Sequence, residues 1–569
     1  MLSSLIAMCC GVFAQSQSDE TSAARTGTIS GRLVNESGQP LANAIVSVRP
    51  FGVMSPGRNT TSDSEGGFQI AGLDPLSYYL SALLPGYVTP PRDPDQTPSP
   101  YYHVGDSVRL ELIKGGVITG TVLKSAGEPV VVVPVRAYMV RDSNGRPARY
   151  TTPFREQTTD DRGVYRIYGL PAGTYVVSAG GGPSYGYSVN AFGTDAPTYA
   201  PSSTRDAAAE IVVRAGEETT NVDIRYRGEP GHIVSGTASS SVLADQLPRF
   251  NILLSSIFNG ESQTGYQTYQ VPGRGFSFYG VADGEYDVIA QSFTPGGDWV
   301  LSEPKRIRVK GADITGLELA ANPLGSINGQ VALEESKAPE CKGKRRTLLS
   351  EIVVTPWHNE KTAPRDQPQF VWGLSGPVLP DQHGDFVLRN LAPGQYRFHA
   401  QPSAKYWYLK SILWPSTAAK PPPASRPPDA ARNWTTVKAG DRFSGLVITL
   451  AEGAASFRGQ IENAAGQKLP PRLFVYLVPL ESDKADVLRF FAALVLPDGS
   501  FSLGNLPPGR YWAIARAAAE NETNVLSKLR LPEEAEAREK LRLAAGAAKS
   551  EIELKPCQNV TDYQLPFRP

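Results

Sequence analysis

The sequence predicts an all-β protein, a tandem array of five antiparallel β-sandwiches with Greek-key connections and about seven strands each. Three observations lead to this prediction. A pattern of aromatic residue, leucine or valine, tyrosine and alanine recurs five times at fixed spacing. A strand with a central glycine precedes each copy, and a glycine followed by two apolar residues closes most copies. Fixed spacing at so many positions indicates a repeated supersecondary unit.

The centre of each unit is a pair of strands joined by a tight turn. An aromatic residue and a tyrosine ten positions later mark the two strands in every unit. These pairs are Phe68 and Tyr78, Tyr165 and Tyr175, Phe276 and Tyr286, Phe386 and Tyr396, and Phe501 and Tyr511. Apolar residues alternate with polar ones after each aromatic, as in a strand with one solvated face. We expect each tyrosine to be structural, with its ring in the core and its hydroxyl bonded to a backbone carbonyl.

Each unit also has an opening strand and a closing strand. The opening strands carry the pattern apolar-x-Gly-x-apolar, with glycine at positions 31, 120, 236, 329 and 459. A glycine at the centre of a strand predicts a bulge or a close approach of another backbone. The closing strands are predicted from apolar pairs six and eight residues after Gly216, Gly311, Gly440 and Gly546, with a shortened version after Gly105.

These signals divide the chain into five units with short connections. The predicted segments are a signal peptide (1–14), an N-terminal linker (15–26), sandwiches at 27–113, 116–228, 231–320, 325–450 and 453–556, and a C-terminal tail (557–569). The fourth unit carries insertions, and the fifth contains a short helix predicted at 532–545. Because the connections are only a few residues long, we expect a semi-stiff string of sandwiches.

The N-terminus and the cysteines indicate export. Residues 1–14 are apolar and end in Val12-Phe13-Ala14, which resembles a signal-peptidase site, and no later segment approaches a transmembrane run. We therefore predict a secreted, periplasmic or outer-surface location. Cleavage leaves Cys341 and Cys557, which an oxidising compartment allows to form a disulfide; two unpaired thiols are the alternative.

The charge balance excludes a general attraction to nucleic acid. Lysine plus arginine and aspartate plus glutamate number 56 each, so no net field draws polyanions. The densest basic cluster comprises Lys342, Lys344, Arg345 and Arg346 and is expected to be a solvated loop. Acidic turns at Asp160 and Asp381 suit either calcium or a local hydrogen bond within a hairpin, and the hairpin is favoured because neither turn supplies a full ligand series.

The motifs I-x-G-x-V, G-x-F-x-L and L-x-P-G-x-Y, followed by alanine, resemble the carboxypeptidase regulatory-like domain. This family is a prealbumin-like sandwich found beside metallocarboxypeptidases and in many bacterial surface proteins, and it is grouped with starch-binding-like folds. The resemblance extends over all five units, as expected for a bacterial-type secreted protein. It implies the fold and leaves activity open, because function depends on the sites that a fold carries.

Enzymes related to this fold have requirements that the sequence does not meet. None of the five histidines is followed by glutamate three residues later, as a metallocarboxypeptidase zinc site needs. His383 and His399 lie too far apart for the His-x-His pattern of intradiol dioxygenases, and Tyr226-Arg227-Gly228-Glu229 lacks the terminal serine of transthyretin-like hydrolases. The opening strands also lack the lysine that forms isopeptide bonds in Cna-B-type adhesins. We therefore predict no catalytic residues, no metal site, no cofactor and no enzyme activity.

Tryptophan is concentrated in the fourth unit, which contains five of the seven. Exposed aromatic rings commonly hold sugar rings, so the ligand-binding prediction comprises Trp372, Tyr406, Trp407, Tyr408 and Trp414. The alternative, which the sequence favours somewhat, is that these rings pack under the insertions. The predicted function is therefore a non-catalytic binding protein for a polysaccharide or cell-envelope glycan. The alternatives are a structural spacer or adhesion stalk with protein partners, and an auxiliary subunit.

Overall fold

The structure is a computed structural model, and β-strands are the main secondary structure of the residues that it describes. It describes residues 26–52, 56–90, 101–143, 145, 155–181, 191–243, 249–258, 261–270, 275–294, 296–359, 376–414, 429–462, 468–470, 472–481, 487–519 and 525–567. The predicted signal peptide and the candidate ligand residue Trp372 lie outside the described residues.

The first two sandwiches follow each other with a small two-stranded sheet between them. The first contains β1 (Gly27–Val34), β2 (Ile45–Pro50), β3 (Arg58–Thr61), β4 (Gly67–Leu73), β5 (Ser77–Leu83), β7 (Tyr102–His103) and β8 (Ser107–Glu111). The second contains β10 (Gly116–Lys124), β11 (Pro134–Asp142), β12 (Arg155–Thr158), β13 (Val164–Leu170), β14 (Gly173–Ala179), β15 (Thr198–Tyr199), β16 (Ile211–Val213), β17 (Glu218–Thr219) and β18 (Ile224–Tyr226). Strands β6 (Tyr87–Val88) and β9 (Ile113–Lys114) pair at their junction.

The other three sandwiches are larger. The third contains β19 (His232–Ser239), β20 (Asn251–Phe258), β21 (Glu261–Tyr269), β22 (Phe276–Val281), β23 (Gly284–Phe293), β24 (Trp299–Ser302), β25 (Lys305–Val309) and β26 (Ile314–Pro323). The fourth contains β27 (Gly325–Glu334), β28 (Val353–His358), β29 (Asp385–Leu391), β30 (Gly394–Gln401), β31 (Trp407–Leu413), β32 (Thr435–Val437) and β33 (Arg442–Glu452). The fifth contains β34 (Ala455–Glu462), β35 (Leu473–Pro479), β36 (Phe491–Leu494), β37 (Ser500–Leu506), β38 (Gly509–Ala517), α1 (Val525–Leu529), α2 (Ala535–Ala548), β39 (Glu551–Leu554) and β40 (Asn559–Pro566).

The same two-sheet plan recurs along the chain, which confirms the predicted array of five sandwiches. In the first sandwich one sheet has the order β4-β1-β8 and the other the order β3-β2-β5-β7, with a shared apolar core between them. The second, fourth and fifth sandwiches repeat this plan, and in the third β24 pairs with both β23 and β26 and joins the two sheets. The opening strand pairs antiparallel with the aromatic strand but parallel with the closing strand, as β1 does with β4 and β8. The sheets are therefore mixed, and in the second sandwich the opening strand β10 is parallel to both β17 and β18.

The glycine of each opening strand allows a close approach on both sides. Gly31 lies opposite Phe68 across the antiparallel pair and opposite Val108 across the parallel pair. A Cβ at this position would overlap the carbonyl oxygen of Val108 and contact the Phe68 ring at 2.6 Å. Gly459 has the same relation to Phe501 and to the carbonyl oxygen of Tyr563. Both predicted explanations apply, because the register of the parallel pair also shifts immediately before Gly236, Gly329 and Gly459.

The predicted tyrosine corner forms in every sandwich. Each tyrosine hydroxyl donates to the carbonyl oxygen four residues earlier, at 2.8–2.9 Å. The donor and acceptor residues are Tyr78 and Asp74, Tyr175 and Pro171, Tyr286 and Ala282, Tyr396 and Ala392, and Tyr511 and Pro507. Burial is the main cause that raises the pKa of Tyr78, to about 12, and the pKa of Tyr175, Tyr286 and Tyr396. These four phenols are structural groups that stay protonated at neutral pH.

The acidic turns use their carboxylates within the turn. Oδ1 of Asp160 accepts backbone N–H groups from Arg162 at 2.9 Å and Val164 at 2.8 Å, and Asp381 repeats this pattern. Backbone hydrogen bonds are the main reason that the pKa of both carboxyls is lowered. The hairpin explanation therefore holds, because the oxygen that a calcium ion would need already accepts two N–H groups.

The fifth sandwich ends later than the sequence predicts. The expected closing pair, Ile552 and Leu554, lies in β39, which pairs antiparallel with the tyrosine strand β38. The parallel partner of the opening strand β34 is β40, within the segment expected to be a tail. The spacing rule fails here because Gly546 lies inside α2. This helix ends at Ala548, past the predicted end at residue 545.

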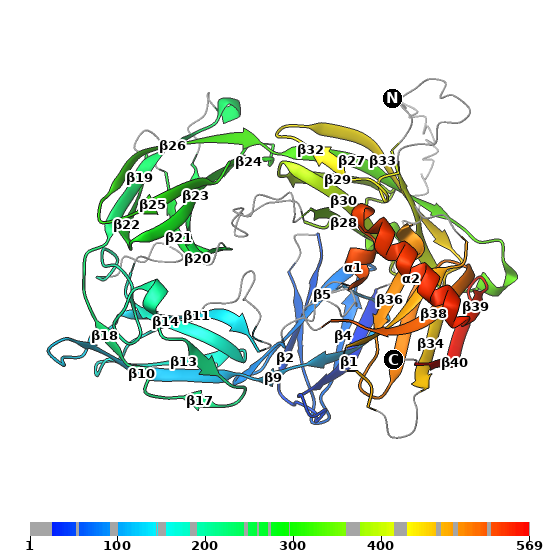
Figure 1. The fold of residues 1–569 in the computed structure, drawn as a ribbon, viewed down its shortest axis with the longest axis horizontal. Helices are drawn as coiled ribbons and strands as arrows, with labels where there is room; N and C mark the ends of the chain where they lie inside the picture. The colour runs from blue at the N-terminus through cyan, green and yellow to red at the C-terminus, as the bar shows by residue number, and fades with distance from the viewer. Residues whose placement is uncertain are drawn as a thin grey trace, which may run out of the picture.

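The chain turns back on itself so that the first sandwich meets the fourth. Figure 1 shows the chain passing through the second and third sandwiches and returning at the fourth to lie beside β5. The hydroxyl of Ser77 donates to the carbonyl oxygen of Glu351 at 2.9 Å, and the hydroxyl of Ser350 donates to that of Pro75 at 2.9 Å. The expected string of sandwiches is therefore wrong in its overall course, because these contacts between distant units close it.

Candidate functional site

Two of the predicted ligand-binding residues, Trp407 and Trp414, belong to the core of the fourth sandwich. Trp407 starts β31 and is only 1% exposed, in the same cluster as Ile412 and Phe398. Trp414 is partly buried and packs edge-on against Phe398, at 6.4 Å between ring centroids, and against Phe443 at 5.9 Å. Both tryptophans are therefore held inside by packing, the alternative that the sequence had left open.

The two neighbouring tyrosines are partly buried. The hydroxyl oxygen of Tyr406 accepts a hydrogen bond from Nδ2 of Asn559 in the fifth sandwich at 3.0 Å. The ammonium groups of Lys344 and Lys405 lie 5.0 and 5.4 Å from its ring centroid. The bond from Asn559 and both lysines lower the pKa of Tyr406, whereas burial raises that of Tyr408. With Trp407 and Trp414 in the core, the described residues of the predicted set do not make an exposed aromatic platform.

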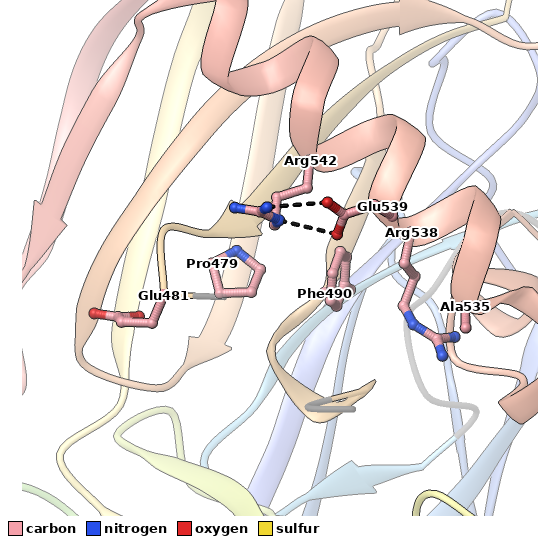
Figure 2. Close-up of a pocket in the computed structure, with 7 residues that line it drawn as sticks. All are labelled: Pro479, Glu481, Phe490, Ala535, Arg538, Glu539 and Arg542. Carbon is pink, nitrogen blue, oxygen red and sulfur yellow. Dashed lines mark hydrogen bonds and ion pairs between the residues drawn. The ribbon is translucent and has the colours of Figure 1, made fainter. Parts of the chain in front are cut away.

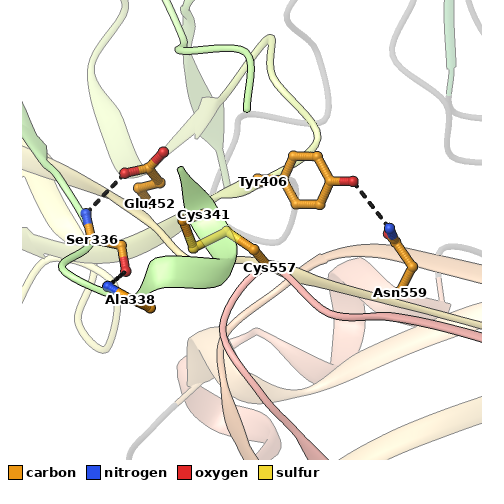
Figure 3. Close-up of a disulfide and its surroundings, with 7 residues drawn as sticks. All are labelled: Ser336, Ala338, Cys341, Tyr406, Glu452, Cys557 and Asn559. Carbon is orange, nitrogen blue, oxygen red and sulfur yellow. Dashed lines mark hydrogen bonds between the residues drawn. A yellow bond between two sulfur atoms is a disulfide. The ribbon is translucent and has the colours of Figure 1, made fainter. Parts of the chain in front are cut away.

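Tyr406 lies at a covalent junction between the fourth and fifth sandwiches. Figure 3 shows Cys341, at the end of a 3-10 turn, bonded to Cys557 just before β40, with an S–S distance of 2.04 Å. Asn505, near the end of β37, donates from Nδ2 to the carbonyl oxygens of Trp407, at 2.7 Å, and of Ala404, at 3.2 Å. The two sandwiches are therefore held together by a disulfide and by side-chain bonds to the backbone.

The helical segment of the fifth sandwich covers the outer face of the sheet β28-β30-β32. On β30, Arg397 and His399 point away from the core. The Trp434 ring lies 5.7 Å from the Arg397 guanidinium, and its Nε1 donates to Glu533 at 3.1 Å. Burial lowers the pKa of Arg397 to about 10, and burial together with Arg530 and Arg397 lowers that of His399 to about 3. His399 is thus neutral at physiological pH.

A small pocket lies between α2 and the end of β35. Its lining residues are Pro479, Glu481, Phe490, Ala535, Arg538, Glu539 and Arg542. Figure 2 shows the guanidinium of Arg542 joined to the carboxylate of Glu539, at 3.0 Å. Arg538 donates from Nη1 to the carbonyl oxygens of Leu529 and Leu531, at 2.8 and 2.6 Å. The charged groups of this pocket therefore fasten α2 and its preceding turn.

The junction of the first and fourth sandwiches contains a buried polar cluster that the sequence did not reveal. The hydroxyl of Ser77 lies 3.1 Å from Nε2 of His103, and Nδ1 of His103 lies 3.7 Å from the Asp106 carboxylate. This arrangement of hydroxyl, imidazole and carboxylate resembles the catalytic triad of a serine hydrolase. However, Ser77 donates its proton to the Glu351 carbonyl oxygen, and both side chains are buried under the fourth sandwich. The cluster therefore joins the two sandwiches.

The Glu351 side chain extends this cluster into the fourth sandwich. Its carboxylate accepts from Nη2 of Arg345 at 2.8 Å and from the hydroxyl of Ser403 at 2.7 Å. Arg345 thus has a structural partner, although its side chain is exposed as expected for a solvated loop. No local pattern could have indicated this, because Ser77 and Glu351 are 274 positions apart in the sequence.

Two further features concern the described residues, the grouping of metal-ligating side chains and the length and hydrophobicity of the helices. In the part of the chain that the structure describes, three or more histidine, cysteine, aspartate or glutamate side chains nowhere gather as metal ligands would. None of the helices in the same ranges has the length and hydrophobicity to cross a bilayer.

Comparison with known proteins identifies the first unit. Residues 28–97 match the family model of the carboxypeptidase regulatory-like domain, which confirms the resemblance read from the motifs for this unit. No curated protein matches the chain.

Several solved structures are similar to parts of the chain at low identity. The TIE protein of Bacillus anthracis is 16% identical, with 52% of this chain and 51% of that one covered and a TM-score of 0.14, so the match spans about half of its length. The major pilin subunit of Bacillus cereus is 10% identical, with 52% and 99% covered and a TM-score of 0.14. Two B repeat units of the collagen binding protein of Staphylococcus aureus are 12% identical, with 75% and 100% covered and a TM-score of 0.13.

Proposed function

We propose that this protein is a non-catalytic binding protein that works outside the cytoplasm, with five sandwiches that form a closed frame for protein partners. The observation that carries this proposal is the contact between the first and fourth sandwiches. An extended stalk would leave these units apart, whereas Ser77, Ser350 and Glu351 bond them across a buried interface. A closed frame keeps the faces of the sandwiches in fixed relative positions, which reduces the entropy lost when a partner binds several of them.

The disulfide supports a location outside the cytoplasm, and the hydrogen bonds of the corner tyrosines and turn aspartates support a non-catalytic role. A buried disulfide between Cys341 and Cys557 suits an oxidising compartment, in agreement with the apolar segment at 1–14. The tyrosines at the sandwich corners and the aspartates of the acidic turns are used in local hydrogen bonds. Such groups stabilise the sandwiches and are not poised for proton transfer or nucleophilic attack.

A second candidate is the binding of a polysaccharide or cell-envelope glycan. Among the described residues of the fourth sandwich the support comes from Trp357, which is 39% exposed and lies 5.9 Å from the His399 ring. Burial of Trp407 and Trp414 counts against the site predicted from the sequence. More exposed aromatic rings lie in other sandwiches, among them Phe293 at 63% and Tyr279 at 54% in the third and Tyr168 at 56% in the second.

Two measurements on the full chain test the main proposal. Expression in a bacterial host with residues 1–14 present should deliver the protein outside the cytoplasm without free thiols, as measured with a thiol reagent under denaturing conditions. Small-angle scattering of the purified protein should then fit a closed arrangement of five units. Retention in the cytoplasm with Cys341 and Cys557 reduced, or scattering from an extended string, would contradict the proposal. Cross-linking on intact cells would then identify the partner.

A further inference from the structure

The outer face of one sheet in the third sandwich carries an unusual set of polar and aromatic side chains. Along β20 and β23, Ile252, Leu254, Val288 and Ala290 point into the core. Side chains alternate along a strand, so the residues between them face the other way. Asn251 and Gln291 lie on this outer face, side by side in the register of β20 and β23.

Gln291 is a buried amide without a hydrogen-bond partner. Its side chain is only 1% exposed, and within the described part of the chain neither its Oε1 nor its Nε2 has a partner. The Oδ1 atom of Asn251 beside it is also without one. Buried polar atoms are nearly always hydrogen-bonded, and an exception at two adjacent side chains indicates a place where another molecule supplies the bonds. Amides offer both donors and acceptors, as hydroxyl groups require.

Aromatic rings border the two amides on the same face. Phe293, two residues beyond Gln291, is 63% exposed and pairs across the strands with Trp299, whose ring lies 5.9 Å away. On the other side of Asn251, its register partner Tyr269 is 38% exposed. We call these five side chains the amide face. Flat apolar surfaces beside amide groups match the two kinds of surface that a sugar ring presents, its C–H bonds and its hydroxyls.

The carboxylates beside the amide face are paired with arginines. Asp287 on β23 is bonded to Arg306 at 2.6 and 3.1 Å. Asp298, beside Trp299, is bonded to Arg389 of the fourth sandwich at 2.9 Å and lies 3.5 Å from the guanidinium of Arg442. The groups of the amide face itself are uncharged amides and mainly apolar aromatic rings, and such groups suit an uncharged ligand.

We propose that the amide face binds a neutral saccharide. The sugar ring lies against Phe293 and Trp299 or against Tyr269, and its hydroxyl groups bond the amides of Asn251 and Gln291. Asn251 is only partly buried, so the ligand enters there and reaches Gln291 behind it. The site lies where the third sandwich meets the fourth, since Trp299 also donates from its backbone N–H to Asn390 at 2.9 Å. Junctions between domains are a common place for ligand sites.

The test uses the full chain and neutral oligosaccharides as probes. Maltohexaose, cellohexaose and chitohexaose are mixed with the protein, and saturation transfer to the sugar protons is measured by NMR, with hexagalacturonate as a charged comparison. We expect at least one neutral probe to bind, and its affinity to fall at least tenfold in Gln291→Leu and in Phe293→Ser. Gln157→Leu, at an exposed position of the second sandwich, makes the same replacement elsewhere and should bind like the wild type.

A second readout separates loss of the site from loss of the fold. Leucine has nearly the shape of glutamine and no polar atoms to satisfy, so Gln291→Leu should unfold at the same temperature as the wild type or at a higher one. A lower unfolding temperature would show that Gln291 is bonded within the protein and would overturn the proposal. So would the absence of binding by all three neutral probes, binding of hexagalacturonate alone, or binding that survives Gln291→Leu. The inference rests on the proposal that the chain acts by binding, but its failure would leave the closed frame intact, because scattering tests that separately.

Discussion

The junction between the fourth and fifth sandwiches and the junction between the first and fourth both join distant parts of the chain, but they are built differently. The first of these has the disulfide between Cys341 and Cys557, with Asn505 bonded to the backbone around Trp407. The junction between the first and fourth sandwiches is held by hydroxyl groups, such as that of Ser77, which donate to backbone carbonyl oxygens. One junction is covalent and the other is polar and reversible.

This difference indicates how a chain of similar modules acquires a shape. Adjacent sandwiches are joined by short linkers, as between Pro323 and Gly325, which restrict their orientation at little entropic cost. Closing the chain on itself brings together units more than 200 residues apart, and the hydrogen bonds at that junction must offset the entropy of closure. We therefore expect the frame to open at the first and fourth sandwiches before the fourth and fifth separate.

The largest effect is expected from Trp407→Ala. This substitution removes a fully buried indole from the core of the fourth sandwich, beside the covalent junction. Loss of a buried tryptophan costs about 3–5 kcal/mol of unfolding free energy. Denaturant unfolding followed by circular dichroism measures it, and Trp357→Ala at a 39% exposed position is the matched control. Equal effects of the two substitutions would mean that Trp407 is not in the core.

Removal of the disulfide tests the covalent junction. A double variant, Cys341→Ser with Cys557→Ser, should lose about 2–5 kcal/mol, because the cross-link no longer restricts the unfolded chain. The midpoint of denaturant unfolding gives the loss. A reducing agent should lower the midpoint of the wild type to that of the variant and leave the variant unchanged. A wild type insensitive to reduction would show that the bond does not hold the junction.

The polar junction should respond to a smaller change. Ser77→Ala combined with Ser350→Ala removes two hydrogen bonds between the first and fourth sandwiches, worth together about 2 kcal/mol. Because both bonds belong to the junction, the radius of gyration from small-angle scattering should increase while the sandwiches stay folded. Ser202→Ala, which removes a bond to Arg225 within the second sandwich, should leave the radius unchanged. An unaltered radius in the double variant would show that other contacts close the frame.

The smallest expected effect is a pH dependence from His399 under the helical segment. Its pKa is lowered from 6.5 to about 3 in the folded chain, so the unfolded chain takes up the proton first as the pH falls. The stability that His399 contributes is complete above pH 6.5 and is lost progressively below it, about 1 kcal/mol by pH 5.5. Unfolding midpoints at pH 7.5 and 5.5 should differ less in His399→Gln than in the wild type. His383→Gln, in an exposed turn, should keep the full difference, and identical behaviour of both variants would refute this role.

The sequence by itself determined the sandwich and its repeated local devices. Gly31 and its counterparts, the corner tyrosines such as Tyr511 and the turn aspartates such as Asp160 are each recognised by spacing within one unit. Their partners lie four residues away or on a neighbouring strand in fixed register, so the contacts follow from strand geometry alone.

The tertiary structure alone decided which aromatic rings are exposed, which strand closes the fifth sandwich and where the chain meets itself. Trp407 is buried because β31 turns it into the core, and β40 rather than β39 lies beside β34 because a helix interrupts the usual spacing. Ser77 and Gln291 give no local signal, since their surroundings come from segments far away in the sequence. Local spacing specifies which residues are neighbours along and across strands, whereas burial and long-range contacts depend on how complete sandwiches pack.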